Sequence, residues 1–304
     1  GGKPHGLEHH ADAHGVRGEN LAHQRDGGLA RARHTRRLHG TCLSLGARVF
    51  QHRAGKYVLR FAWSRHDLHA VQALRYRVFC EELGEGTPDT TAPAATSARE
   101  ADERDPWFHH LMICERSSGA VVGTYRLQTA VMAATRHGFY SATLFELGAV
   151  PGSVLIGAVE IGRACVDPAH RSGRVLRLLW KGIARYLQWN DKQYLFGCCS
   201  LAGVAQEPAV EAWRALHARH AMHDRILVRP RPAARALPDD GRVRPLIDAT
   251  ALAAELPPLF EGYLALGAKV CGAPALDHAF GTTDFLVLLD IHDMDARSYA
   301  SLFG

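Results

Sequence analysis

Two charged residues interrupt a stretch that otherwise has the composition of a core strand: Glu160 and Arg163 in VEIGRACV. Buried strands seldom carry such side chains unless these are paired or functional. A carboxylate on a half-buried strand has a raised pKa, which suits a base that takes a proton from an amine. The alternative is an ion pair that only ties the sheet together. Such a pair needs a bulge, since residues three apart on a regular strand face opposite sides. We favour the functional role.

Two further charged residues are candidates for binding a substrate. Arg126 alternates with apolar neighbours in GTYRLQT; its guanidinium could bind a carboxylate with two hydrogen bonds, or reach solvent from a strand edge. Asp102 follows a loop rich in Gly, Pro, Ser and Thr (residues 84–100) and could hold a cation. Because loop carboxylates are usually only solvated, the residues alone favour that alternative for Asp102, whereas the two alternatives for Arg126 are balanced.

A basic stripe follows the candidate strand. At about 100° per residue, a helix over residues 174–187 places four cationic side chains on one face and the apolar ones on the other. The cationic residues are Arg174, Arg177, Lys181 and Arg185. We expect the apolar face to pack on a sheet and the basic face to point outward, as a landing surface for an acidic protein. The alternative is an ordinary solvated helix face.

The elements that must position these residues mix strands and helices without strict alternation. Apolar and alternating patterns predict strands over residues 57–64, 107–116, 120–130, 159–166, 193–201 and 283–291. Helical spacing predicts helices over residues 65–83, 207–222 and 257–267 in addition to the basic one. This order predicts one α/β or α+β domain over residues 56–304.

Residues 1–55 differ from the rest of the 304-residue chain. They contain nine Lys and Arg against four Asp and Glu, which accounts for the whole net charge of +5, and eight of the nineteen histidines. Without a sustained apolar period, this segment is predicted to be a disordered, basic and His-rich extension. A metal-binding or nucleic-acid-binding tail is less favoured, because no ligand spacing repeats and no aromatic residues are interleaved. We therefore expect no nucleic-acid partner.

The cysteines and the apolar runs bear on the compartment. The seven cysteines are odd in number and form no C-x-x-C pair, which indicates buried thiols in a reducing cytoplasm. No apolar run approaches the roughly 20 residues of a membrane span, so any contact with the inner membrane is expected to be peripheral.

A series of motifs points to a family. HHLMICE, GTYRLQT, GFYSATLFEL, EIGRACVDPAHR, LFGCCS and TTDFLVLL follow one another in this order. The set resembles the ornithine N-acyltransferases that make lyso-ornithine lipid, which have the GNAT fold. The resemblance implies a mixed, twisted α+β sheet in which residues 159–166 and 194–200 splay apart to admit an acyl-pantetheine. It also implies transfer of a 3-hydroxyacyl group from acyl carrier protein to the α-amino group of ornithine.

The resemblance also suggests roles for individual residues. The chain is distantly similar to acyl-homoserine-lactone synthases, which share an Arg-x-Phe element, here Arg77 and Phe79, and a Glu-x-x-Arg, here Glu160 and Arg163. Glu160 and Arg163 are the expected catalytic residues. The expected substrate-binding residues are Arg77, Phe79, Asp102 and Arg126. No metal or other cofactor is expected.

The donor is expected to be acyl carrier protein. Acetyl-CoA enzymes of this fold have a glycine-rich turn that holds a pyrophosphate at a helix start, whereas HRSGRVL offers only Gly173. Pantetheine on a carrier protein has a single phosphodiester and needs less. The expected contacts of this donor are Arg171, Gly173, Arg174, Arg177 and Lys181. Two alternatives stay open: a synthase of N-acyl amino acids or homoserine lactones with another amine acceptor, and a non-catalytic module that binds acyl carrier protein.

Overall fold

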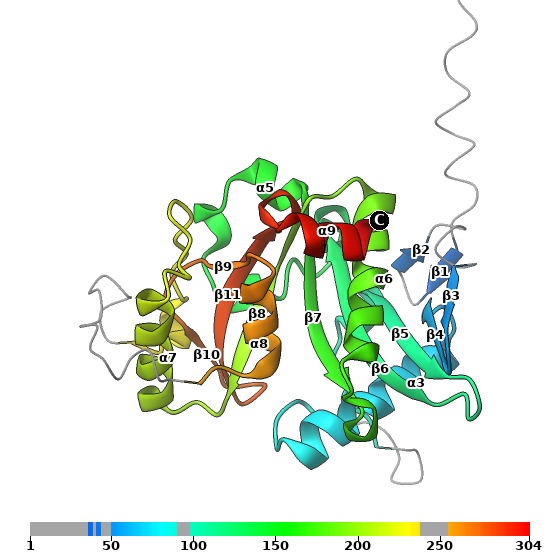
Figure 1. The fold of residues 1–304 in the computed structure, drawn as a ribbon. Helices are drawn as coiled ribbons and strands as arrows, with labels where there is room; N and C mark the ends of the chain where they lie inside the picture. The colour runs from blue at the N-terminus through cyan, green and yellow to red at the C-terminus, as the bar shows by residue number, and fades with distance from the viewer. Residues whose placement is uncertain (1–35, 39–40, 44–49, 90–97, 238–254) are drawn as a thin grey trace, which may run out of the picture. The chain divides into compact units, whose positions relative to one another are not determined.

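A nine-stranded sheet organises the chain (Figure 1). The computed structural model describes residues 36–38, 41–43, 50–89, 98–237 and 255–304. Along the sheet the order is β10-β11-β8-β7-β6-β5-β4-β3, and β9 also pairs with β11. Every pairing is antiparallel except that of β7 with β8. The strands are β3 Gln51–Ala54, β4 Tyr57–Phe61, β5 His109–Glu115, β6 Val121–Thr129, β7 Ala158–Val166, β8 Tyr194–Ala202, β9 Lys269–Val270, β10 Ala275–Asp277 and β11 Thr282–Asp290.

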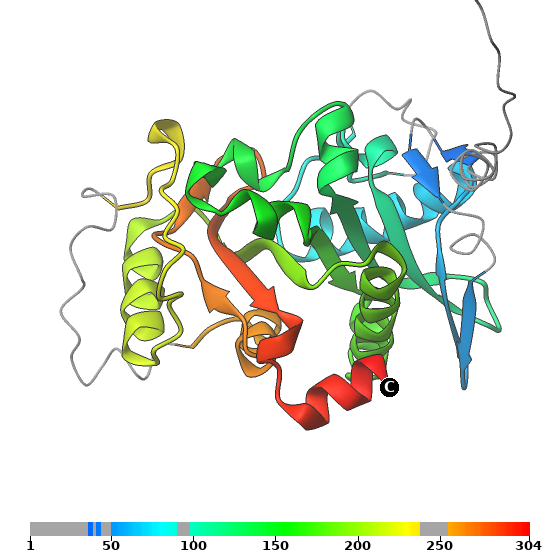
Figure 2. The same cartoon turned by 90° about the horizontal axis from the view of Figure 1, so that it is seen from above.

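Helices cover both faces of the sheet. They are α3 Arg65–Arg75, α4 Ala130–Thr135, α5 Gly152–Ile156, α6 Arg174–Asn190, α7 Gln206–Ala218, α8 Pro258–Ala265 and α9 Ala296–Phe303. On β5, Leu111 and Ile113 pack with α6, whereas Met112 and Cys114 pack with α3. Successive residues of a strand point to opposite faces, so these two helices lie on opposite sides of the sheet. In both views α6 and α9 lie side by side (Figure 2).

Strands β7 and β8 pair over only three residues before they separate. The parallel register runs from Ala158 opposite Tyr194 to Glu160 opposite Phe196 and then stops, although both strands continue for six more residues. In Figure 1 the two strands diverge beyond this point. The splayed pair expected from the motifs is therefore present, and we call the point of separation, at Glu160 and Phe196, the fork.

The structure moves one predicted boundary and resolves one predicted helix into two parts. Gln51–Ala54 is mostly exposed and pairs with β4, so the sheet begins before the boundary predicted at residue 55. A separate ladder joins β1 Arg36–Leu38 to β2 Thr41–Leu43; the rest of the predicted extension lies outside the described residues. The helix predicted over residues 65–83 ends as α3 at Arg75 and continues as a π-helix, Tyr76–Glu82.

Two sequence expectations concern thiols and membranes. The six cysteines whose side chains are described are free, and four of them are buried. None of the helices in the described ranges is both long enough and apolar enough to cross a bilayer.

Candidate active site

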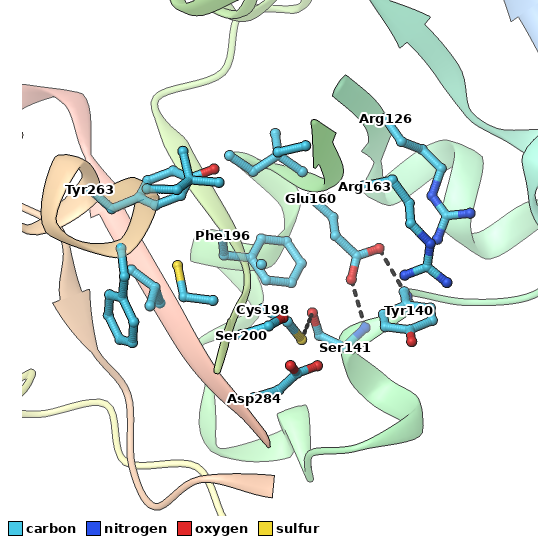
Figure 3. Close-up of a pocket in the computed structure, with 18 of the residues that line it drawn as sticks. Arg126, Tyr140, Ser141, Glu160, Arg163, Phe196, Cys198, Ser200, Tyr263 and Asp284 are labelled. Atoms are coloured by element: carbon cyan, nitrogen blue, oxygen red, sulfur yellow. Dashed lines mark hydrogen bonds between the residues drawn. The ribbon is translucent and has the colours of Figure 1, made fainter. Parts of the chain in front are cut away.

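A cavity of about 230 Å³ opens where β7 and β8 separate, and its two walls differ in character (Figure 3). One wall, on the α8 side of the sheet, is mostly apolar. It consists of Ile161, Leu195, Cys199, Leu259, Phe260, Tyr263, Val287 and Leu289. The other wall contains the polar side chains among phenylalanine rings. Its polar residues include Arg126, Tyr140, Ser141, Glu160, Ser200, Asp277 and Asp284, and the rings are those of Phe79, Phe108, Phe196 and Phe280. The fork thus connects an apolar compartment with a polar one.

Glu160 lies at the fork with its carboxylate on the polar side. It is 2% exposed and accepts hydrogen bonds from the backbone N–H groups of Tyr140, at 2.9 Å, and Ser141, at 2.7 Å. Those N–H groups belong to the start of the 3₁₀ turn Ser141–Thr143, where helical donors lack internal partners. Burial raises the pKa of Glu160 even though these hydrogen bonds act to lower it. The residue is therefore both an anchor for this turn and a carboxylate suited to taking a proton near neutral pH.

Arg163 occupies a bulge on β7. Opposite the segment of β6 from Thr124 to Arg126, strand β7 contains one more residue than β6. In this bulge Arg163 has a φ of +50°, which is an uncommon conformation for a residue with a side chain. Its side chain is 9% exposed and lies over the Phe280 ring, 4.1 Å from the centroid. The predicted alternative, an ion pair between Glu160 and Arg163, is absent from the described residues: Arg163 contacts Glu100 and Asp102 instead, each at 3.4 Å.

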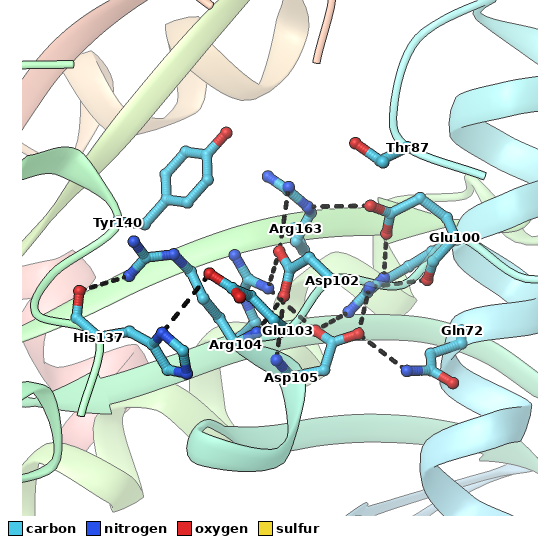
Figure 4. A network of polar contacts seen from close by, with 12 residues as sticks. Gln72, Thr87, Glu100, Asp102, Glu103, Arg104, Asp105, His137, Tyr140 and Arg163 are labelled. Atoms are coloured by element: carbon cyan, nitrogen blue, oxygen red, sulfur yellow. Dashed lines mark hydrogen bonds and ion pairs between the residues drawn. The ribbon is translucent and has the colours of Figure 1, made fainter. Parts of the chain in front are cut away.

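A buried charge network lies beside the cavity (Figure 4). Its members are Arg75, Arg126, Arg163, Glu100, Asp102 and Asp105. At its centre Arg75, which is fully buried, donates to Glu100 at 2.5 Å and to both oxygens of Asp105, at 2.8 and 2.7 Å. Although burial acts to raise the pKa of Asp105, the charge of Arg75 holds it well below the usual range.

Arg126 and Asp102 lie together in this network. Arg126 is 2% exposed, donates to Asp102 at 2.6 Å and to Asp105 at 2.9 Å, and stacks over Phe108, 4.4 Å from the ring centroid. The solvent-exposed alternative is wrong for both: Arg126 is in a central strand and does not reach solvent, and Asp102 is ion-paired and mostly buried. Substrate binding by either residue stays a prediction. Burial acts to raise the pKa of Asp102, but the charges of Arg126 and Arg163 hold it below the usual range.

Of the predicted Arg-x-Phe pair, Phe79 lines the cavity and Arg77 does not. Phe79 packs edge-on against Phe280, with 5.3 Å between centroids. Arg77 is half exposed and contacts Asp167 at 3.6 Å. The arginine that this segment contributes to the buried charge network is Arg75, one half-turn earlier, because the inward face of α3 passes through residues 68, 71, 72 and 75. Arg77 thus lies outside the cavity lining, and substrate binding by Arg77 and Phe79 stays a prediction.

The residues expected to contact the donor lie around the start of α6, outside the cavity. Arg171 binds both carboxylate oxygens of Glu82, at 2.5 and 2.7 Å. Gly173 precedes α6 with a φ of +78°, where a side chain is disfavoured. Arg174, Arg177 and Lys181 are exposed, while Val175, Leu178, Leu179 and Ile183 are buried. The amphipathic helix is therefore confirmed, and donor binding by its basic face stays a prediction.

Several polar residues of the site were not predicted as such from the sequence. Ser141 lies in the motif GFYSATLFEL and Asp284 in the motif TTDFLVLL, but neither residue has a spacing from other polar residues that indicates a functional site. The Tyr140 hydroxyl donates to Asp277, a contact between residues far apart in sequence. No cluster of three or more His, Cys, Asp or Glu in the described part of the chain is arranged to hold a metal ion.

A family model and several solved structures are similar to parts of this chain. A family model for the acetyltransferase (GNAT) domain matches residues 74–181. The solved structure of an N-acyl amino acid synthase from uncultured soil microbes covers 79% of this chain and 95% of its own length at 12% identity, with a TM-score of 0.46. The acyl-homoserine-lactone synthase LasI covers 84% and 96% at 15% identity, with a TM-score of 0.41.

Curated relatives match over most of the chain. The L-ornithine N(alpha)-acyltransferase of Agrobacterium fabrum is 34% identical over 266 residues, which cover 83% of this chain and 86% of the relative. That of Rhizobium meliloti is 35% identical over 254 residues, which cover 81% and 83%. These matches, with the GNAT domain, confirm the resemblance and the fold class expected from the motifs. The chain belongs to the L-ornithine N(alpha)-acyltransferase family and has the GNAT fold.

Proposed function

We propose that this protein transfers a 3-hydroxyacyl group from acyl carrier protein to the α-amino group of L-ornithine and so forms lyso-ornithine lipid. The observation that carries the proposal is the two-walled cavity at the fork, with Glu160 where the walls meet. Its apolar wall suits an acyl chain and its polar wall an amino acid. The names of the curated relatives support ornithine as the acceptor.

The chemistry requires a neutral amine and a place for developing charge. Glu160 takes a proton from the α-ammonium, and the amine nitrogen then attacks the thioester carbon. As the N–C bond forms and the C–S bond breaks, negative charge develops on the thioester oxygen and must be stabilised by donors already in place. Beyond Glu160 the edge of β7 that faces β8 has no ladder partner there, so its N–H groups are candidate donors, as is Arg163. The attacking nitrogen loses its second proton as the amide forms, the leaving thiolate takes up that proton, and Glu160 releases the first proton to solvent.

The surface around α6 supports a carrier-protein donor. The exposed cationic residues at the start of this helix can attract an acidic protein, while a single glycine at the turn gives a poor cradle for a pyrophosphate. We place the reaction in the cytoplasm, with peripheral contact to the inner membrane when the single-chain product leaves.

Mass spectrometry of lipid extracts tests this proposal in cells. The chain is expressed in a bacterium that makes no ornithine lipid, beside the Glu160→Ala variant at a matched protein level. We expect lyso-ornithine lipid only with the unaltered chain. Accumulation of a different N-acyl amino acid or an N-acyl-homoserine lactone, or of no acylated amine, would overturn the proposal.

A further inference from the structure

The charges around the cavity are unequally matched. The network of Arg75, Arg126, Arg163, Glu100, Asp102 and Asp105 contains three arginines and three carboxylates, and each of them has a partner of opposite charge inside the network. Four other carboxylates line the cavity: Glu85, Glu160, Asp277 and Asp284. Among the described residues none of these four has an arginine, lysine or histidine within 4.0 Å. Buried carboxylates normally have a cationic partner or bind a cation.

Asp284 is the carboxylate with the most capacity for a cation. It is 2% exposed, and its hydrogen-bonding neighbours are the neutral hydroxyls of Thr282, at 3.0 Å, and Ser200, which lies opposite it on β8. Asp277 is already used by the Tyr140 hydroxyl and by the N–H groups of two residues, Ala279 and Phe280. Burial, together with the nearby charge of Asp277, raises the pKa of Asp284 to about 6.

A second, independent feature of the polar compartment points to the same ligand. The guanidinium of Arg163 lines the cavity, its Nε atom is buried without a hydrogen-bond partner, and its nearest carboxylates are 3.4 Å away. This arginine therefore retains donors for a further carboxylate. Figure 3 shows Arg163 on one side of Glu160 and Asp284 on the other. Along the polar wall, the hydrogen-bond donors of Arg163, which could bind a carboxylate, are thus followed by the base Glu160 and then by the unpaired carboxylate of Asp284.

We propose that Asp284 binds the side-chain ammonium of the acceptor amino acid and thereby makes the enzyme selective for a diamino acid. The proposal rests on the proposed function. The acceptor's carboxylate lies at Arg163 and its α-amino group at Glu160, so its side chain extends toward Asp284. Ammonium binding neutralises the carboxylate that burial leaves unpaired, and Asp277 adds attraction from the side. An acceptor without a side-chain cation leaves Asp284 buried and uncompensated.

The test compares two acceptors that differ by one amino group. Purified protein is assayed with a 3-hydroxyacyl carrier protein and either L-ornithine or L-norvaline, which has the same carbon skeleton without the δ-amino group. We expect the unaltered enzyme to prefer ornithine in kcat/KM by at least about 100-fold. In Asp284→Asn this preference falls by about 10- to 100-fold, mainly through KM for ornithine. The matched control is Asp290→Asn, which makes the same change on the same strand outside the cavity.

A structural role for Asp284 would give a different pattern. Because burial disfavours its charged form, the neutral asparagine should keep or raise the Tm, which shows that the variant is folded. An unchanged preference for ornithine in a folded Asp284→Asn would overturn the inference and leave the proposed function intact. If the unaltered enzyme does not acylate ornithine, the proposed function and this inference fall together. An equal loss in Asp290→Asn would also contradict the inference.

Discussion

Gly197 on β8 lies so close to the carbonyl oxygen of Ile161 on β7 that a Cβ on this glycine would come within 2.2 Å of that oxygen. The contact is one residue beyond Glu160 and Phe196, the last paired residues of the two strands. The backbones therefore touch at the fork through an atom that any side chain would displace, and the cavity begins where they part.

The fork should not tolerate even one added methyl group. Gly197→Ala is expected to lower the free energy of unfolding by about 1–3 kcal/mol, because the backbone must shift to remove the clash. Gly162→Ala is the matched control, since a Cβ there meets no atom within 4 Å. Urea denaturation of both variants measures the difference. Equal stabilities would contradict the close approach of the two strands.

How much of this arrangement the sequence predicts depends on how local its causes are. The central strands and α6 were predicted because their apolar periods are long, and the fork followed from the motifs. Strand β3 was missed because its residues, QHRA, are polar and lie at the edge of the sheet. The partners of Arg75 lie 25 and 30 residues along the chain, so no local pattern separates it from Arg77. In the sequence Asp284 likewise cannot be distinguished from an ordinary polar residue at the start of a strand.

The two arginines at the end of α3 should differ sharply in their effect on stability. Arg75→Met removes the cation nearest to the buried carboxylates of Glu100 and Asp105 and should cost about 3–5 kcal/mol. Arg77→Met removes only an exposed contact with Asp167 and should change stability by less than about 0.5 kcal/mol. Chemical denaturation of the two variants checks this. A similar cost for both would contradict the placement of Arg75 inside the buried network and of Arg77 outside it.

Glu160 should affect both folding and the pH dependence of the reaction. A glutamine there can accept only one of the two backbone hydrogen bonds, so Glu160→Gln should lower the Tm as well as reduce turnover by roughly 10²–10⁴-fold. Burial raises its pKa, and a base acts only when ionised. At saturating ornithine, where the proposed ammonium partner of Asp284 is already bound, kcat of the unaltered enzyme should therefore fall as the pH decreases through a value above the usual glutamate range.

The loss of activity at low pH, which is the acid limb of the pH profile, separates the two roles of Glu160. If it is the base, the residual activity of Glu160→Gln no longer falls through this pH range. If the limb persists unchanged in the variant, Glu160 only anchors the turn at Ser141 and another group takes the proton.

The basic face of α6 should matter for the donor and not for the fold. Arg177→Glu with Lys181→Glu is expected to raise the KM for acyl carrier protein, most strongly at low salt, and to leave the Tm unchanged because both side chains are exposed. The defect should shrink with a short acyl-pantetheine donor. The control, Arg225→Glu with Arg229→Glu, makes the same charge change in the segment after α7. Equal KM values for both double variants would leave the stripe without a role in docking.

Fragmentation of the reaction product tests the central claim most directly. Purified protein is incubated with a 3-hydroxyacyl carrier protein and L-ornithine, and tandem mass spectrometry locates the new amide. The proposed placement of ornithine at the fork, with its α-amino group at Glu160 and its side chain directed toward Asp284, predicts that the acyl group is on the α-nitrogen and that the δ-nitrogen remains a free amine. An acyl group on the δ-nitrogen, or no acylation of ornithine, would contradict it.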